Sequence, residues 1–274
     1  MKVRDGRGDG MTIRFGGTDE APLLADLYLP NVDGPRPLVV AATGGGWVRG
    51  HRRTLAQWGA YLSARGFAMA SIDYRRATHG PAYPGNAEDV AAALNHFARE
   101  GQAYKVDPQR LVLLGVSAGA HLAALVALSD RFTAPAPRGL IAVSGVYDLM
   151  VQWQHDLALN SPPGEDKIER MIGCTPFNDP QVYHDASPLR QITYAKAMPV
   201  MLAWGHLDRD IPPDQSVRFA QALRQARFPV RTFEFPDAAH HWLAEQEFTD
   251  VGSHCARLAP DLLRFLKTHI EGDA

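Results

Sequence analysis

The sequence contains few of the features that mark disulfide-stabilised, membrane-spanning or nucleic-acid-binding proteins. Its 274 residues include only two cysteines, Cys174 and Cys255, which lie far apart and lack metal-binding spacing. A disulfide between them is compatible with the sequence, but a chain of this length does not need one. No apolar run reaches the roughly 18 residues that a membrane span requires. A formal net charge of -2 leaves no basic surplus for nucleic acid or an anionic membrane.

The beginning of the chain also lacks a recognisable targeting signal. Residues 1–10 are polar and glycine-rich, and no apolar run of signal-peptide length follows them. We therefore expect a cytoplasmic protein. Hydrophobic residues make up 46% and charged residues 21%, the usual proportions of a soluble globular protein. The length and the absence of a linker predict one domain over residues 1–274.

Short apolar segments alternate with helical patterns along most of the chain. This alternation is typical of βαβ units around a parallel sheet. The patterns predict strands at 23–28, 38–42, 68–73, 111–114, 140–144, 200–204 and 230–235, and helices at 54–65, 86–99, 118–129, 215–226 and 256–270. The fold class is therefore α/β, with a mostly parallel central sheet and helices on both faces.

The alternation lapses over residues 147–187. This insertion contains scattered prolines around one predicted helix at 165–172. Long irregular insertions in compact domains are usually functional. We therefore expect a lid or a pocket wall here, with Trp153 as one of its apolar surfaces.

Ser117 lies between a predicted strand and a predicted helix, in the segment GVSAG at residues 115–119. The segment matches G-x-S-x-G, in which a sharp strand-to-helix turn exposes a nucleophilic serine. Glycines on both sides allow neighbouring segments to approach closely. The alternative is a serine that only caps the following helix.

A nucleophilic serine needs a base, because its hydroxyl is a weak nucleophile near neutral pH. His240 and His241 follow the last predicted strand, at the sheet edge where open α/β folds bind ligands. The alternative is a turn with one exposed histidine and one that caps a helix. His121 lies one helical turn after Ser117, and we interpret it as structural because a base needs room for substrate.

An orienting acid is expected between serine and histidine in the chain order Ser, Asp, His. Asp208 and Asp210 both follow the strand predicted at 200–204. A carboxylate at this position would hold the imidazole in the required tautomer and stabilise the imidazolium.

Three consecutive glycines, residues 44–46, follow the strand predicted at 38–42. Their N–H groups, together with that of Ala118, could form an oxyanion hole. Two nucleotide-binding patterns fail at their deciding positions. His51 and Arg52 stand where a phosphate loop needs Lys and Ser or Thr, and Arg49 stands where a dinucleotide motif needs glycine.

The chain resembles α/β-hydrolases of the carboxylesterase and lipase group, which includes hormone-sensitive-lipase-like esterases and kynurenine formamidases. The motifs TGGGW, DYRRA, VSAGAHLA, SGVYDL, SPLRQI, GHLDRDIPP and HHW occur in that group's order over nearly the whole chain. Two positions depart from its pattern. Thr43 replaces a usual histidine, which puts loop geometry and acyl preference in question, and Ala120 replaces a glycine.

The resemblance implies a role for each candidate residue. It assigns Ser117 as nucleophile and Asp208 as acid. It assigns His241 as base, because formamidase-like members place an aromatic residue directly after the histidine, here Trp242; His240 is the fallback. The implied oxyanion donors belong to Gly45, Gly46 and Ala118.

The implied function is that of a serine hydrolase that cleaves small carboxylic esters through an acyl-enzyme, with no metal or cofactor. Its partner would be a small-molecule ester, and Trp47 is expected to contact it. An arylformamidase with the same triad is one alternative. A non-catalytic ligand-binding protein of the same fold is another, although such a protein is expected to lack a triad member.

Overall fold

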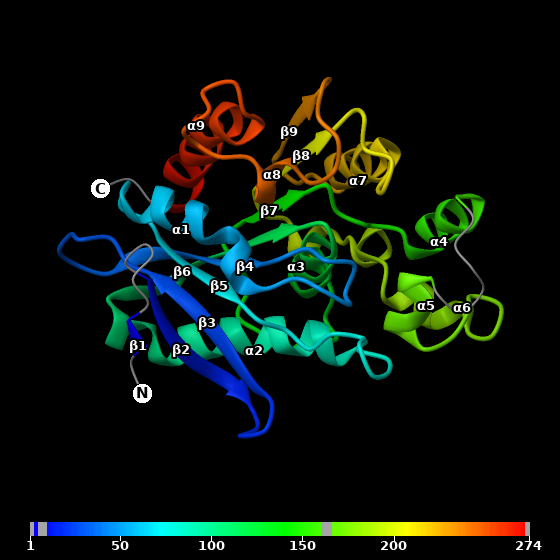
Figure 1. Ribbon diagram of the computed structural model, residues 1–274, viewed down its shortest axis with the longest axis horizontal. Helices are drawn as coiled ribbons and strands as arrows, with labels where there is room; N and C mark the ends of the chain where they lie inside the picture. The colour runs from blue at the N-terminus through cyan, green and yellow to red at the C-terminus, as the bar shows by residue number, and fades with distance from the viewer. Residues whose placement is uncertain (1–2, 5–9, 160–165, 272–274) are drawn as a thin grey trace.

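The computed structural model describes residues 3–4, 10–159 and 166–271. Within these residues, nine strands form one sheet in the order β1-β2-β3-β5-β4-β6-β7-β8-β9 (Figure 1). The strands are β1 (Val3–Arg4), β2 (Gly10–Gly17), β3 (Pro22–Tyr28), β4 (Arg36–Ala42), β5 (Ala68–Ile72), β6 (Val106–Val116), β7 (Leu140–Val143), β8 (Val200–Gly205) and β9 (Val230–Phe235). The strands from β4 to β9 pair in parallel, and β1, β2 and β3 pair antiparallel.

Helices lie on both faces of the sheet. The α-helices are α1 (Ala56–Ser63), α2 (Gly85–Glu100), α3 (Ala118–Leu128), α4 (Leu149–Ala158), α5 (Lys167–Ile172), α6 (Pro180–Asp185), α7 (Pro213–Gln225), α8 (Trp242–Glu245) and α9 (His254–Leu266). Shorter helical turns are η1 (Arg52–Leu55), η2 (Gly101–Tyr104), η3 (Pro188–Gln191), η4 (Tyr194–Lys196) and η5 (Lys267–Glu271).

The central strands separate two hydrophobic cores. In β4, Leu38 and Val40 pack into one core with α2, α3 and α7, whereas Val39 packs into the other with α1 and α9. This division follows from the two-residue period of a strand, because successive side chains point to opposite faces. Both faces are covered, so the strand consists of an almost unbroken apolar run. Figure 1 shows α1 and α9 on one side of the sheet and α2 and α3 on the other.

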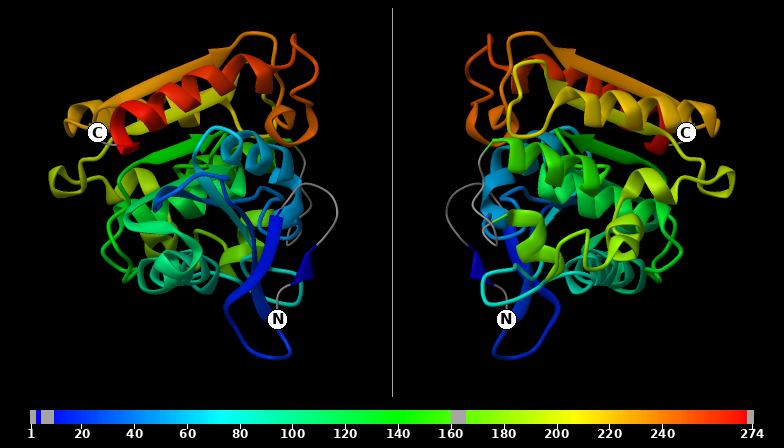
Figure 2. Two further views of the ribbon diagram at one scale, coloured as in Figure 1. Left: turned by 90° about the vertical axis from the view of Figure 1, so that its left-hand side faces the viewer. Right: turned by 90° about the vertical axis from the view of Figure 1, so that its right-hand side faces the viewer.

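Each strand and helix predicted outside the insertion is present, within a few residues at the ends. No strand was predicted at β2, which pairs antiparallel with β3. Its mixed burial pattern gives a weak apolar signal, because much of it faces solvent. The β2–β3 hairpin projects from the body of the protein (Figure 2).

In the described parts of the insertion, 147–159 and 166–187, there are three α-helices instead of the one predicted. The prediction at 165–172 corresponds to α5, and Glu165 lies outside the described residues. The helices α4 and α6 were missed, although each has a capping signal in the sequence. Asp148 accepts a hydrogen bond from the N–H of Val151, and Asp179 caps α6 immediately before Pro180.

Cys174 and Cys255 both carry free thiols. Among the described residues, no helix combines the length and apolar character needed to cross a membrane.

Candidate active site

Ser117 occupies the sharp turn between β6 and α3. Its backbone has φ 54 and ψ -121, a conformation that is strained for any residue with a side chain. Its N–H donates to the carbonyl oxygen of Val143 at 2.8 Å, and its side chain makes no capping hydrogen bond to α3. The helix-cap alternative for Ser117 is therefore wrong.

The glycines around Ser117 are required by close chain contacts. A Cβ on Gly115 would lie 2.3 Å from the carbonyl oxygen of Gly119, and one on Gly119 would lie 2.1 Å from that of Ala42. No side chain fits at either position. The expectation that these glycines permit close approach is confirmed.

A continuous hydrogen-bonded chain joins Ser117 to His240 and Asp208. The Nε2 atom of His240 lies 2.8 Å from Ser117 Oγ, and its Nδ1 atom lies 2.7 Å from Asp208 Oδ2. An ionised carboxylate only accepts hydrogen bonds, so we assign the imidazole proton to Nδ1. This tautomer leaves Nε2 free to accept the hydroxyl proton of Ser117. The chain is shielded, since His240 and Asp208 are both buried.

Backbone contacts hold Asp208 toward His240. The other carboxylate oxygen, Oδ1, accepts hydrogen bonds from the N–H groups of Asp210 at 3.1 Å and Ile211 at 2.8 Å. A Cβ on Gly205 would lie 2.3 Å from the carbonyl oxygen of Ala238. The loops after β8 and β9 therefore touch, which brings acid and base together.

The interpretation of His241 as the base is wrong. Its Nε2 atom lies 3.3 Å from Asp210 Oδ2, and these two side chains are 63% and 58% exposed. The aromatic residue after His241, which favoured this histidine as the base, has a structural role instead. Trp242 is buried, with its ring centroid 5.0 Å from that of Phe235. Burial of Trp242 anchors the turn, in which His240 points inward and His241 points to solvent.

The glycine loop, residues 43–50, passes directly beside the serine. A Cβ on Gly44 would lie 3.1 Å from Ser117 Cβ. Gly45 and Gly46 have φ 126 and 58, which favour glycine. Within the described part of the chain, the N–H groups of Gly45, Gly46 and Ala118 have no hydrogen-bond partner, and all three residues line the pocket that contains Ser117.

This pocket has a volume of about 540 Å³. The glycine loop, Ser117 and His240 form one side of it. The insertion contributes Gln152, Asp156, Leu159, Asp166 and Lys167. Among the described residues, no group of three or more His, Cys, Asp or Glu could hold a metal ion.

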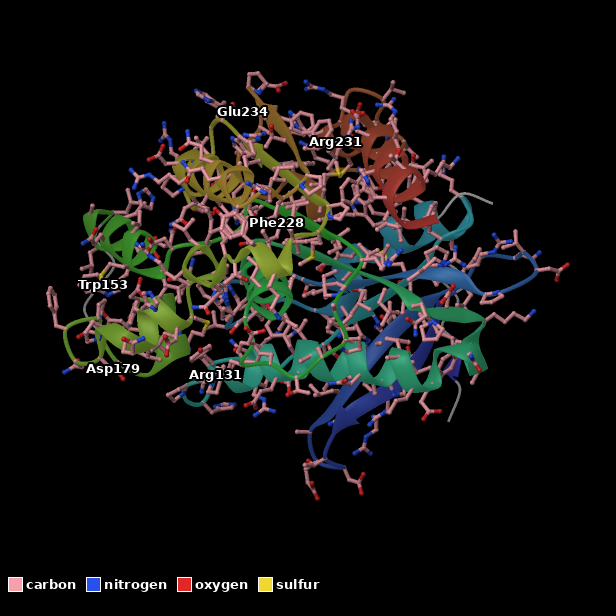
Figure 3. The ribbon with its side chains drawn as sticks, turned by 180° about the vertical axis from the view of Figure 1, so that it is seen from behind. Arg131, Trp153, Asp179, Phe228, Arg231 and Glu234 are labelled. Carbon is pink, nitrogen blue, oxygen red and sulfur yellow. The ribbon has the colours of Figure 1, made fainter. Side chains whose placement is uncertain are left out.

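The two predicted apolar walls differ in their position. Trp47 lines the pocket but is only 3% exposed. Trp153 does not line it, so that prediction is wrong. Its Nε1 donates to Glu169 Oε1 at 2.7 Å, and its ring packs edge-on against Phe177. Figure 3 shows Trp153 and Asp179 together in the insertion, at the end of the molecule away from Arg231.

His121 is fully buried, as its structural interpretation requires. Burial lowers the pKa of His121 to about 4, so the imidazole is neutral at physiological pH. Its Nδ1 accepts a hydrogen bond from Trp47 Nε1, and its Nε2 donates to the carbonyl oxygen of Ala186. Both ring nitrogens are thus occupied, and neither contacts Ser117.

Two carboxyl groups in the pocket wall, those of Asp156 and Asp166, were not predicted from the sequence. Asp166 caps α5 through Oδ1, which accepts from the N–H groups of Ile168 and Glu169, while its Oδ2 is buried. The carboxyl group of Asp166 lies close enough to that of Asp156 to interact with it. Burial and the nearby Asp166 raise the pKa of Asp156 to about 6, although a hydrogen bond from Gln152 opposes the shift.

Asp156→Asn is expected to remove a pH dependence of stability. An unfolded aspartate has a pKa of about 3.9, so between this value and about 6 the folded protein binds the extra proton. Its stabilising contribution is complete below the unfolded pKa and is lost as the pH rises through about 6. Because Asp156 is partly exposed, we expect the free energy of unfolding of the wild-type protein to fall by only about 1 kcal/mol over this pH range. Urea unfolding at pH 4.5 and at pH 7 measures this change in the free energy of unfolding. Asp19→Asn, at an exposed position, is the control, and parallel wild-type and Asp156→Asn profiles would contradict the prediction.

The fold and the site together define a class of protein. A serine at the turn after β6, an aspartate after β8, a histidine after β9 and a glycine loop after β4 are the arrangement of an α/β-hydrolase. More specifically, the chain belongs to the BD-FAE family, whose family model matches residues 25–223.

Curated relatives and solved structures agree with this assignment. The chain is 31% identical over 218 residues to isoprenylcysteine alpha-carbonyl methylesterase ICME of Arabidopsis thaliana, covering 73% of this chain and 49% of that protein. It is 32% identical over 218 residues to esterase LipC of Mycobacterium tuberculosis, covering 75% and 53%. The chain thus spans about half the length of the curated relatives it matches. A propionate-bound esterase of Thermogutta terrifontis has the same fold, with a TM-score of 0.78, 21% identity and 97% coverage of each chain.

Proposed function

We propose that this protein is a serine hydrolase that cleaves carboxylic esters of small molecules through an acyl-enzyme. The observation that carries the proposal is the hydrogen-bonded chain from Ser117 Oγ through His240 to Asp208. The names of the curated relatives, which include a methylesterase and an esterase, support the same chemistry.

The acylation step follows from this geometry. Ser117 Oγ attacks the carbonyl carbon of the ester while His240 Nε2 accepts the hydroxyl proton. Negative charge develops on the carbonyl oxygen, and the N–H groups of Gly45, Gly46 and Ala118 are the donors that we assign to it. Collapse of the tetrahedral intermediate breaks the bond to the leaving alcohol, which takes the proton from His240.

Deacylation repeats these steps with water. His240 accepts a proton from water as the water oxygen attacks the acyl carbon, and the proton then returns to Ser117 Oγ. In both half-reactions Asp208 holds the Nδ1–H tautomer and stabilises the imidazolium. The insertion contributes residues to the lining of the pocket, and a volume of about 540 Å³ suits a small molecule.

The two alternative functions are less well supported. A non-catalytic binding protein does not need a connected triad, whereas here all three members are joined by hydrogen bonds. An arylformamidase would use the same triad, but the curated relatives reported above are named as esterases.

Substrate comparison and covalent labelling test the proposal. We expect the native protein to hydrolyse p-nitrophenyl acetate with a higher kcat/KM than N-formylkynurenine. A fluorophosphonate should abolish this activity and add one label to the peptide that contains Ser117, detected by mass spectrometry. Faster hydrolysis of the formamide would favour the arylformamidase, and a label on another residue would contradict the assigned nucleophile.

A further inference from the structure

A buried hydrogen-bonded chain links the glycine loop to the insertion through the helix that follows the nucleophile. Trp47 Nε1 donates to His121 Nδ1 at 3.1 Å, and His121 Nε2 donates to the carbonyl oxygen of Ala186 at 2.8 Å. The direction of both bonds is fixed, because an indole N–H only donates and a carbonyl oxygen only accepts. His121 and Ala186 are fully buried, and Trp47 almost so.

The Trp47 end of this chain holds a strained stretch of backbone. Trp47 has φ 58, a left-handed value that is unfavourable for a residue with a large side chain, and it follows Gly46, also at φ 58. Such a conformation persists only where surrounding contacts determine it. Two contacts do so here. The Trp47 carbonyl oxygen accepts from the N–H of Ala77 at 2.9 Å, and its indole is held by His121.

The Ala186 end is equally fixed. Ala186 directly follows α6, and the next residue, Ser187, ties the two ends of the insertion together. Ser187 Oγ accepts from the N–H of Leu149 at 2.9 Å and donates to the carbonyl oxygen of Tyr183 at 2.7 Å. The carbonyl group that His121 contacts is therefore part of a rigid corner.

We propose that His121 is a positioning residue, which as a neutral imidazole holds the Trp47 indole and thereby aims the N–H groups of Gly45 and Gly46 at the oxyanion. The proposal rests on the proposed function for the identity of that oxyanion. Only the neutral ring fits the site, because a protonated Nδ1 would point a second donor at the indole N–H. The low pKa of His121, a consequence of its burial, agrees with this requirement.

Three variants separate the two hydrogen bonds of His121. His121→Asn places an amide oxygen near the former Nδ1, so it retains an acceptor for Trp47 but cannot reach Ala186. His121→Gln places its amide near the former Nε2, so it retains the contact with Ala186 and leaves the indole without an acceptor. Trp47→Phe removes the indole donor and keeps an aromatic ring. Leu94→Ala, in the buried face of α2, is a control for lost stability alone.

Each variant is assayed at 20 °C for kcat and KM on p-nitrophenyl acetate and for inhibition by a trifluoromethyl ketone, whose adduct carries an oxyanion. Complete loss of one oxyanion donor costs about 10²- to 10³-fold in kcat. Trp47→Phe and His121→Gln would displace the N–H groups of Gly45 and Gly46 without removing them. We therefore expect these variants to lose roughly 10- to 100-fold in kcat, with matching losses in ketone affinity and little change in KM. His121→Asn should lose much less. Leu94→Ala should lower Tm without changing kcat.

Equal kcat losses in His121→Asn and His121→Gln, or a kcat loss in Leu94→Ala of the same size, would overturn the proposal. A readout independent of catalysis separates its failure from that of the proposed function. The Trp47 indole proton should exchange slowly with solvent in the native protein and in His121→Asn, and much faster in His121→Gln. Unchanged exchange in His121→Gln would contradict the anchoring role, whereas slow native exchange in a protein without esterase activity would contradict only the proposed function.

Discussion

His240→Ala is expected to lower kcat for a p-nitrophenyl ester by roughly 10⁵-fold or more, whereas His241→Ala should change it by less than about threefold. The two residues are adjacent, but only His240 contacts both Ser117 and Asp208. Without this imidazole, no group is placed to accept the Ser117 proton or to transfer it to the leaving alcohol. His241→Ala removes an exposed ion pair with Asp210 and an edge-on ring contact with His240, and surface pairs of this kind contribute about 0 to 1 kcal/mol.

Steady-state kinetics at pH 7.5 and thermal unfolding of both variants check this prediction. Tm separates a lost base from a lost fold, and the His241→Ala protein is the matched control one residue away. A large kcat loss in His241→Ala with near-normal activity in His240→Ala would restore the assignment made from the sequence. It would also mean that the loop after β9 rearranges when substrate binds.

Ser117→Ala is expected to lower kcat by roughly 10⁶-fold and to abolish fluorophosphonate labelling. The substitution removes the attacking oxygen and its hydrogen bond to His240. Serine and alanine both carry a Cβ, so the strained φ of 54 is no worse in the variant and the elbow should fold unchanged.

Ser144→Ala is a close control for this substitution. Ser144 also has a positive φ, 47, and lies buried at the end of the neighbouring strand β7. Within the described residues its hydroxyl has no hydrogen-bond partner, so its removal should leave both kcat and Tm almost unchanged. Comparable activity losses in the two variants would indicate damage to the sheet edge and would count against a nucleophilic role for Ser117.

Local sequence patterns were sufficient for most of the fold. The alternation of apolar runs and helical periodicity placed the parallel strands because a strand buried on both faces must be apolar throughout. The strand β2 was missed because only Ile13 and Phe15 of its eight residues are buried, so it carries no continuous apolar run. Within the insertion, α4 and α6 are short and were visible only through their caps, Asp148 and Asp179.

Some residues of the candidate site could likewise be predicted from the sequence, and others could not. The elbow at Ser117 could be predicted because its glycines satisfy a steric requirement within a few residues of chain. The place of the acid after β8 could be predicted, although Asp208 and Asp210 both lie there and only the resemblance to known hydrolases favoured Asp208. The choice between His240 and His241 could not, because both share one local context and the direction of each side chain depends on how Trp242 packs against Phe235.

Local patterns in the chain were enough to predict most of the strands and helices, the nucleophile elbow and the loop that carries the acid, since each depends on interactions between residues close together in the chain. Long-range contacts were needed to show which histidine contacts Ser117, that Asp156 and Asp166 lie close together, and that Trp47, His121 and Ala186 form one chain. These contacts join residues from different segments. Their distances and burial depend on the packing of the whole domain, which no local pattern encodes.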